Sequence, residues 1–526
     1  MITEDQSDVV AYLSSPATHA GAAVERMDTH ASIVFLAGDR AWKLKRAVRY
    51  AYLDYSTAAR RRAMCEAEVR INRRTAPSLY RGITAITRQT DGSLALGGDG
   101  TPVDWLVEMA RFDQSGLFDR LAEAGLLPLK LMLPLSHAIA RFHRTAEGRM
   151  TDGGWDAMRR IIDGNTAGFA GEGAGILDSL TCARLTDRAR FAVDRVGPLL
   201  DRRRDDGMVR HCHGDLHLRN IVLLGGEPTL FDAIEFNDGI SSIDVLYDLA
   251  FLLMDLWRLG LPHHANVLWN GYLAETGDLG GLPLMPLFLS CRAAVMAKTT
   301  ATSANLQHDD GRRQELGKLA HDYLALAAAL LEPPRPCLVA VGGLSGTGKS
   351  TLAMDLAPSV GAAPGAVVIR SDEVRKTLCG VKPLDRLGAE GYTDDVSRRV
   401  YRTLMAHADT VVRGGYAAIA DAVFANAADR AAIQHVAAAA GVPFVGLWLD
   451  APESVLISRV TERGPDVSDA GVEVVRHQLA RPLDSLSWPR LDASGTRPQV
   501  VEAATAIVGC LDETDRWLLR SAHHDS

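Results

Sequence analysis

Residues 337–357 read CLVAVGGLSGTGKSTLAMDLA, and this stretch decides the fold of the C-terminal part of the chain. The apolar run CLVAVGG has the length of a buried strand and ends in glycine, whereas TLAMDLA has the composition of a helix. Between them, residues 343–350 match the pattern G-x-x-x-x-G-K-[ST] at every defined position. A strand, a glycine-rich turn and a helix in this order predict a loop that holds phosphate groups, against the alternative of a chance glycine-rich turn.

The residue types of this loop suit phosphate binding. Its glycines allow backbone N–H groups to close around phosphate oxygens, where side chains would block the approach. Lys349 is expected to place its charge on the β- and γ-phosphates of ATP, and the Ser350 hydroxyl to complete a Mg²⁺ shell. The N-terminus of the following helix also favours phosphate. The predicted nucleotide-binding residues are Gly343, Leu344, Ser345, Gly346, Thr347, Gly348, Lys349, Ser350 and Thr351.

Two candidate catalytic residues follow the next predicted strand, in IRSDEVRKTL. Ligands of parallel α/β sheets bind at the carboxyl ends of the strands, where this segment places Asp372 and Arg375. Asp372 is expected to accept the proton of an acceptor hydroxyl, and Arg375 to hold a phosphate or the substrate. The alternative is that Ser371 or Asp372 only caps the helix that follows.

Three further side chains complete this set. Asp421 ends the apolar run AAIAD and is expected to orient Mg²⁺, unless it is a simple strand-end aspartate. Arg459 and Arg463 in SRVTERG lie on one helix face, from which they can clamp a transferring phosphoryl group. Ordinary solvated arginines are the alternative. Strand-like and helical runs alternate through this half, which predicts a parallel sheet flanked by helices.

The motifs GLSGTGKS, RSDEVRK and RVTER, with the strand-end Asp421, carry a resemblance. Residues 337 to about 512 resemble the small-molecule P-loop kinases, a group that includes gluconate kinase, polynucleotide 5′-kinase-like domains, chloramphenicol phosphotransferase and the zeta toxins. The resemblance implies an α/β P-loop domain that transfers the ATP γ-phosphoryl group to a hydroxyl.

The chain divides at the proline-rich segment EPPRP, residues 332–336. Its prolines cannot continue the helical run HDYLALAAALL that precedes them. We therefore expect a first domain over residues 1–332, a linker over 333–336 and a second domain over 337–526. In the first domain, a β-rich lobe over about 1–107 precedes a mainly helical lobe over about 110–332.

The first domain contains its own phosphoryl-transfer signature, HCHGDLHLRN at 211–220. In the pattern His213-x-Asp215-x-x-x-x-Asn220, Asp215 supplies a carboxylate that can act on an acceptor hydroxyl. Asn220 and Asp232 supply oxygen ligands for Mg²⁺. The intervening IVLLGGEPTLFD looks like a hairpin that would return Asp232 to Asn220. A turn capped by Asp and Asn is the alternative.

Upstream, IVFLAGDRAWKLKR predicts a β-hairpin around the Ala-Gly-Asp-Arg turn. Lys43 and Lys45 then share one strand face, and either could neutralise the nucleotide phosphates; we favour Lys43. Glu68 is expected to pair with that lysine from the next helix. Glu66 lies roughly 200° around the same helix, so only one of the two can face the site. The segment Val107-Glu108-Met109 is expected to join the lobes and to offer backbone groups to adenine.

HGDLHLRN and LFDAIEF carry a second resemblance, which covers roughly residues 30–300. This half resembles the aminoglycoside phosphotransferase and choline kinase family, whose fold is protein-kinase-like. The resemblance implies an α+β two-lobed domain in which Asp248, in SSIDVLYDLAFLL, buttresses the catalytic loop; a carboxylate at a helix N-terminus is the alternative. No G-x-G-x-x-G precedes the hairpin, so THAS at 29–32 is left to cover the phosphates.

Composition narrows the class of protein. Apolar residues make up 47% and charged residues 23% of the 526 residues, which is typical of a globular protein. The net charge of −8 argues against general nucleic-acid binding. The chain lacks an uninterrupted apolar run of about 18 residues, so no membrane span is expected. Seven scattered cysteines and an acidic N-terminus indicate the cytoplasm.

Two nucleotide sites on one chain predict a two-module phosphotransferase that uses ATP and Mg²⁺ and acts on small hydroxylated molecules. The alternative is that one module is the catalytic kinase and the other an ATP-binding regulatory or toxin-like, restraining module. The sequence identifies neither the acceptor nor an oligomeric state.

Overall fold

The computed structural model describes residues 2–50, 53–462, 464, 467–481 and 483–521, with side chains up to residue 509. The chain forms two compact units. Unit 1 comprises Met1–Gly168 and Arg190–Asp255, and unit 2 comprises Phe169–Ala189 and Leu256–Ser526. The proline-rich segment 333–336 lies inside unit 2 and has no regular secondary structure, so the domain boundaries predicted above stay a prediction.

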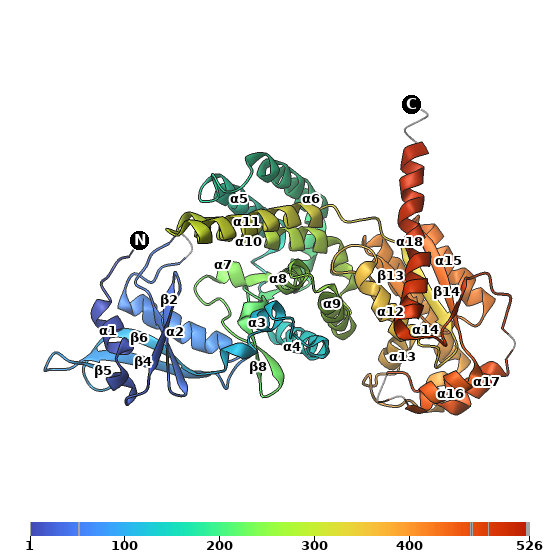
Figure 1. The fold of residues 1–526 in the computed structure, drawn as a ribbon, viewed down its shortest axis with the longest axis horizontal. Helices are drawn as coiled ribbons and strands as arrows, with labels where there is room; N and C mark the ends of the chain where they lie inside the picture. The colour runs from blue at the N-terminus through green and yellow to red at the C-terminus, as the bar shows by residue number, and fades with distance from the viewer. Residues whose placement is uncertain (1, 51–52, 463, 465–466, 482, 522–526) are drawn as a thin grey trace. The chain divides into compact units, whose positions relative to one another are not determined.

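An antiparallel sheet with the order β1-β2-β3-β6-β4-β5 forms the β-rich part of unit 1 (Figure 1). The predicted hairpin is confirmed, because β2 pairs with β3 and Gly38 makes the turn at φ 58°, where glycine is unstrained. The strands are β1 (Val24–Asp28), β2 (Ser32–Ala37), β3 (Arg40–Lys45), β4 (Tyr80–Arg88), β5 (Leu94–Leu96) and β6 (Thr101–Ala110).

Strand alternation divides this sheet into two faces. Trp42 and Leu44 of β3 pack on the face covered by α1 (Ser7–Ser14). Ala41 lies in the opposite core cluster with Cys65 of helix α2 (Ala58–Asn72). Because side chains alternate along a strand, the odd-numbered residues of β3 point toward α2, which brings both lysines of this strand to the helix.

The rest of unit 1 is mainly helical, with short strands around the HGD motif. The predicted hairpin between Asn220 and Asp232 is confirmed: β8 pairs with β9, and the N–H of Phe231 donates to the carbonyl of Asn220 at 3.0 Å. The elements are α3 (Phe118–Glu123), α4 (Met132–Thr145), α5 (Gly154–Ala170), α6 (Ser179–Asp205), β7 (Val209–His211), β8 (Ile221–Leu224), β9 (Glu227–Leu230), α7 (Asp238–Ser241), β10 (Ser242–Asp244) and α8 (Val245–Arg258), of which α5, α6 and α8 continue into unit 2.

In unit 2, helices precede a parallel sheet along the chain. The helices are α9 (Pro262–Thr276), α10 (Met285–Asn305) and α11 (Asp310–Leu330), and the last two lie side by side (Figure 1). The stretch Leu279–Asn305 is long and apolar enough to cross a membrane, but 67% of its most apolar window is buried inside the protein. A core helix accounts for that pattern.

The sheet of unit 2 has the order β12-β13-β11-β14-β15 with all strands parallel, and helices surround it (Figure 1). This topology and the antiparallel sheet of unit 1 confirm the predicted fold class. The elements are β11 (Leu338–Gly343), α12 (Lys349–Leu356), β12 (Val367–Arg370), α13 (Ser371–Leu378), α14 (Asp394–Arg413), β13 (Ala418–Asp421), α15 (Ala427–Ala440), β14 (Phe444–Asp450), α16 (Glu453–Glu462), α17 (Val472–Leu479), β15 (Arg490–Asp492) and α18 (Arg497–Ser521).

Helix α9 completes the outer edge of this sheet. β12 is an edge strand, and the side-chain amide of Asn270 accepts the N–H of Val368 at 2.8 Å and donates to the carbonyl of Ala366 at 3.1 Å. The buried Asn266 donates to the carbonyls of Pro364 and Ala366. An edge strand leaves backbone groups unpaired, and here side chains from a preceding helix satisfy them.

We expect Asn270→Ala to lower the free energy of unfolding by ~1–2 kcal/mol, because it removes the acceptor of the Val368 N–H and one of the two side-chain donors to the Ala366 carbonyl. Urea denaturation measures this change. His263→Ala, on an exposed position of the same helix, serves as control. Equal stability of the two variants would show that these amide contacts contribute nothing.

Candidate functional site

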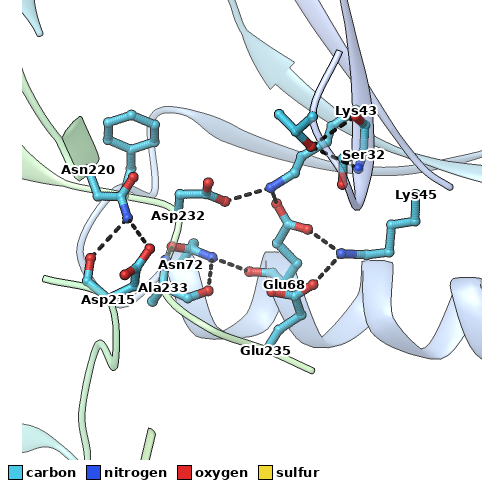
Figure 2. Close-up of polar contacts among 12 residues, drawn as sticks. Ser32, Lys43, Lys45, Glu68, Asn72, Asp215, Asn220, Asp232, Ala233 and Glu235 are labelled. Atoms are coloured by element: carbon cyan, nitrogen blue, oxygen red, sulfur yellow. Dashed lines mark hydrogen bonds and ion pairs between the residues drawn. The ribbon is translucent and has the colours of Figure 1, made fainter. Parts of the chain in front are cut away.

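Strand β3 and helix α2 bring Lys43 and Glu68 together in unit 1. The Nζ of Lys43 lies 2.8 Å from Oε1 of Glu68 and 2.5 Å from Oδ1 of Asp232 (Figure 2). Glu68 is fully buried, whereas the Glu66 side chain is exposed and pairs with Arg62. The structure therefore places Glu68 at the predicted position on the helix, beside the lysine that the sequence analysis favoured.

Lys45 occupies a different place from Lys43. Its Nζ contacts Oε2 of Glu68 at 2.6 Å and the carboxylate of Glu235, and its side chain is 1% exposed. Direct contact with nucleotide phosphates requires access that Lys43, at 15% exposure, has and Lys45 lacks. The geometry thus separates the two lysines, which strand alternation alone could not do.

The prediction that Val107, Glu108 and Met109 join the two lobes is wrong. The three residues lie inside β6, paired with β3 on one side and β4 on the other. Val107 and Met109 are buried in the core beneath α2. A central strand uses its backbone N–H and C=O groups in the two ladders, so these groups face neighbouring strands. The chain leaves the sheet only after Ala110.

The HGD loop is held from behind by Asp248. The backbone N–H groups of His213 and Gly214 donate to the two carboxylate oxygens of Asp248 at 3.1 and 2.8 Å. His143 contacts the same fully buried carboxylate at 3.1 Å. His143, Cys212 and Asp248 lie close enough to hold a metal, but two backbone donors already occupy this carboxylate. Asp248 therefore supports the backbone of the HGD loop through these hydrogen bonds.

The loop positions Asp215 beside Asn220. The Nδ2 of Asn220 donates to the Asp215 carboxylate at 3.0 Å and to its carbonyl at 2.9 Å (Figure 2). His217 contacts the same carboxylate at 3.2 Å. Burial by itself lowers the pKa of His217, but the Asp215 carboxylate outweighs it and raises the pKa above its usual value. The side chain of Asp215 remains 39% exposed.

Asp232 sits at a strained turn. Its φ is 60°, which lies in the left-handed region of backbone conformation that residues other than glycine rarely adopt. Its N–H donates to the hydroxyl of Tyr80 at 3.1 Å, and the next N–H, of Ala233, donates to Oδ1 of Asn72 at 2.8 Å. These contacts hold the turn, and strain of this kind is common where a side chain has a chemical task.

The donor atoms around this turn suit Mg²⁺. Oδ2 of Asp232 and Oδ1 of Asn220 take part in no hydrogen bond with the described residues, and both are the oxygen ligands that Mg²⁺ prefers. Asp232 lies between Asn220 and Lys43 in Figure 2. These residues therefore fit a bound Mg²⁺–nucleotide, with Lys43 as the cation for its phosphates.

In unit 2, the glycine-rich loop joins β11 to α12, as predicted. Gly348 lies before the first helical residue at φ 89°, and Gly346 has φ 87°. A Cβ on Gly346 would lie 2.7 Å from the carbonyl oxygen of Leu456. Both the backbone conformation and the close approach therefore require glycine. The Nζ of Lys349 donates to the carbonyl of Leu344 at 2.9 Å, inside the loop that the pattern predicted to hold phosphates.

The end of the neighbouring strand β13 places Asp421 against this loop. The Ser350 hydroxyl donates to Oδ2 of Asp421 at 2.5 Å, and Arg370 at the end of β12 lies 3.7 Å from the same oxygen. Burial raises the pKa of Asp421, although Lys349 and Arg370 oppose the shift. A hydroxyl and a carboxylate in contact at a phosphate loop form an oxygen donor pair that fits Mg²⁺.

Asp372 lies in the first turn of helix α13, and Arg375 lies in its last turn. Arg375 is 8% exposed; it donates to the carbonyl of Gly391 at 2.8 Å and stacks on the Tyr392 ring at 4.9 Å. Its Nε has no hydrogen-bond partner among the described residues. Arg459 contacts the carbonyl of Thr347 at 3.4 Å, and Arg463 lies outside the described residues.

One cavity of about 1720 Å³ collects most of the predicted residues of this half. Its lining includes residues 344–351, so only Gly343 of the predicted loop set is absent from its walls. The other predicted side chains in the lining are Asp372, Arg375, Asp421 and Arg459.

Several polar residues of the two sites escaped the sequence analysis. In unit 1 they are Tyr55, Asn72, Tyr80 and Glu235, and the only signal in the sequence is that Asn72 follows Glu68 by one helical turn. In unit 2, Gln478 accepts the N–H of Ser345 at 2.8 Å. Asp469 accepts hydrogen bonds from Lys376 and Tyr392, both at 2.8 Å.

Comparison with known proteins gives matches along nearly the whole chain. The uncharacterized protein Rv2004c of Mycobacterium tuberculosis strain H37Rv is 30% identical over 495 residues, which cover 92% of this chain and 95% of that protein. An adenylyl-sulfate kinase of Myxococcus xanthus is 33% identical over 117 residues, which cover 22% of this chain and 59% of that protein. A family model described as an AAA domain matches residues 338–489.

Solved structures match each part of the chain separately. A choline/ethanolamine kinase family protein from Mesorhizobium loti shares 14% identity at a TM-score of 0.33, covering 62% of this chain and 99% of its own. A gluconokinase from Sinorhizobium meliloti shares 19% identity at a TM-score of 0.26, covering 35% and 99%.

The buried Glu68 gives a pH prediction. Burial opposes ionisation, but Lys43 and Lys45 lower the pKa of Glu68 from 4.5 to about 2. The ionised carboxylate thus contributes its full stability above pH 4.5, and the contribution is lost as the pH falls from 4.5 toward 2. We expect Glu68→Gln to cost ~3–5 kcal/mol at pH 7, because it removes one of the two carboxylate partners of each buried ammonium group.

Urea denaturation at pH 7 and at pH 3 measures this difference, which is expected to be smaller at the lower pH. Glu66→Gln, on the exposed face of the same helix, is the matched control. A difference between the wild type and Glu68→Gln that stays constant with pH would contradict the assignment of the stabilising charge to Glu68.

Proposed function

Because the chain belongs to the same family as the uncharacterized protein Rv2004c, whose name states no activity, we propose its function from the two sites. The chain is a two-module phosphotransferase that moves the γ-phosphoryl group of ATP to hydroxyl groups of small molecules. Each module uses its own ATP and Mg²⁺. The observation that carries the proposal is the single cavity in which the phosphate loop, Asp372, Arg375, Asp421 and Arg459 meet.

In unit 2, the acceptor hydroxyl attacks the γ-phosphorus in line with the leaving oxygen of ADP. A bond forms between the acceptor oxygen and phosphorus, the bond to the β–γ bridging oxygen breaks, and the hydroxyl proton passes to Asp372. Lys349 and Arg459 balance the negative charge of the transferring group. Ser350 and Asp421 would hold Mg²⁺, which would neutralise phosphate charge.

Arg375 orients the acceptor in this scheme. Its guanidinium is fixed by Gly391 and Tyr392, so the side chain is ordered before substrate arrives. Ordering in advance reduces the entropy lost when substrate binds. The similarity over 117 residues to the adenylyl-sulfate kinase of Myxococcus xanthus supports a kinase reaction for this module.

In unit 1, Asp215 accepts the proton of the acceptor hydroxyl. Asn220 and Asp232 hold Mg²⁺, and Lys43 neutralises the nucleotide phosphates. Two contacts support these roles: Asn220 donates a hydrogen bond to the Asp215 carboxylate, and Lys43 forms an ion pair with Asp232. A cytoplasmic location is part of the proposal, supported by six free cysteines among the residues with described side chains.

We expect purified full-length protein to consume ATP when a pool of small hydroxylated metabolites contains the acceptor. The pools are sugars, sugar acids, amino alcohols, nucleosides and aminoglycosides. Asp215→Asn and Lys349→Ala are assayed in parallel, and each is expected to lower turnover of its own module by at least about 100-fold. ADP release is the measurement.

The pattern of losses distinguishes the alternatives. If each variant abolishes turnover of a different acceptor, both modules are kinases. If one variant abolishes all turnover and the other changes only the affinity for ATP, one module is regulatory. No stimulation by any pool would contradict the small-molecule acceptor.

We expect Asp372→Asn to lower kcat in unit 2 by about 10²–10⁴-fold with little change in ATP affinity, because only proton transfer is lost. Steady-state kinetics with the acceptor found above, together with ATP titration, measure the two effects. Asp394→Asn, another carboxylate of the same cavity, is the control. Unchanged kcat in Asp372→Asn would contradict its role.

A further inference from the structure

The second lysine of β3 has no direct place in the reaction proposed for unit 1. Lys45 is 1% exposed, and its Nζ lies among Glu68, Glu235 and the hydroxyl of Tyr55, which is 3.3 Å away. A buried ammonium is costly unless carboxylates and hydrogen bonds compensate it. Lys45 has two carboxylates and a hydroxyl as partners. We therefore expect the packing around this site to depend on the positive charge of Lys45.

Lys43 and Lys45 each contact one oxygen of the Glu68 carboxylate. Oε1 of Glu68 faces Lys43 at 2.8 Å, and Oε2 faces Lys45 at 2.6 Å. Figure 2 shows the carboxylate between the two ammonium groups. With both oxygens engaged, the Glu68 side chain cannot turn away from Lys43 without breaking a buried ion pair.

The same lysine also reaches the turn that carries Asp232. Glu235 follows Asp232 by three residues, and its Oε1 contacts Lys45 and accepts the Tyr55 hydroxyl at 2.6 Å. Helix α2 holds this segment at a second point, because Asn72 accepts the N–H of Ala233 at 2.8 Å. Lys45 therefore links β3, helix α2 and the Asp232 turn.

The charges around Lys45 favour the position of the Asp232 turn against helix α2. Two ammonium groups lie among the carboxylates of Glu68, Asp232 and Glu235. Without Lys45, Glu68 and Glu235 would face each other as buried like charges with one cation, Lys43, on the other side of Glu68. Repulsion would then push the Glu235 segment, and the left-handed Asp232, away from helix α2.

We propose that Lys45 is a positioning residue that holds Glu68 against Lys43 and the Asp232 turn against helix α2, so that the Mg²⁺–nucleotide site of unit 1 is assembled before nucleotide binds. This inference rests on the function proposed for unit 1. It assigns Lys45 an indirect role, through Glu68 and Glu235, in place of phosphate contact. An assembled site of this kind needs no separate activating step to bring Glu68 to Lys43.

The test uses full-length protein that carries Lys349→Ala, so that nucleotide titrations report on unit 1. Lys45→Met is compared with Lys45→Arg, which keeps the charge, and with Arg62→Met, which breaks an exposed ion pair of helix α2. Hydrogen exchange of residues 232–236 without nucleotide is the first readout. Calorimetric binding of ATP with Mg²⁺ and with EDTA is the second.

We expect Lys45→Met to accelerate exchange over residues 232–236 and to weaken Mg²⁺–ATP binding by about 10- to 100-fold, as loss of a group behind a metal ligand typically does. Binding of ATP in EDTA should weaken less, because Lys43 remains. Lys45→Arg should recover part of the Mg²⁺-dependent affinity, and Arg62→Met should change neither readout.

Wild-type exchange and wild-type Mg²⁺–ATP affinity in Lys45→Met would overturn the proposal. If Lys45→Met does not fold, Glu235→Gln replaces it, since this variant keeps the Lys45–Glu68 pair and weakens only the link to the Asp232 turn. If the Lys349→Ala parent binds no Mg²⁺–ATP, the function proposed for unit 1 fails, and the exchange of residues 232–236 alone decides the role of Lys45.

Discussion

The carboxylate of Glu68, shared by two lysines, is the interaction on which the site of unit 1 depends. A group that neutralises phosphate must be a cation before the phosphate arrives, and a sheet interior does not tolerate an unpaired cation. Glu68 supplies the carboxylate that pairs with the buried Lys43 ammonium, and Lys45 contacts the other oxygen of the same carboxylate. The turn with Asp232 then joins the same cluster through Lys43 and Glu235, so the two lysines, their carboxylates and this turn form one network.

In unit 2, the groups available to neutralise phosphate are largely backbone N–H groups. Its phosphate loop offers N–H groups that carry no net charge, and its glycines allow the close approach that such a loop needs. At the carboxyl ends of the parallel strands, Asp421 meets Ser350 and Arg370. In the function we propose, the two units would hold phosphate by different physical means, a buried ion network in one and oriented peptide groups in the other.

Local patterns were sufficient for much of this arrangement. The β2–β3 hairpin, the return of Asp232 toward Asn220 and the order of strand, loop and helix around Lys349 all follow from residues close in sequence. Helical periodicity predicted that only one of Glu66 and Glu68 can face the site, and the structure places Glu68 there. The predicted hinge at Val107–Met109 failed because an apolar run does not reveal where a strand ends, and here β6 continues to Ala110.

The sequence by itself determined the fold class and the residue types of both sites, because phosphate loops, catalytic loops and hairpins are built from contiguous residues. Only the tertiary structure decided which lysine faces Asp232, that Glu235 and Asn72 hold the turn, and that α9 completes the edge of the parallel sheet. The reason is physical. These contacts join residues far apart in the chain, and their energy depends on burial and on neighbouring charges, which exist only once the elements have packed.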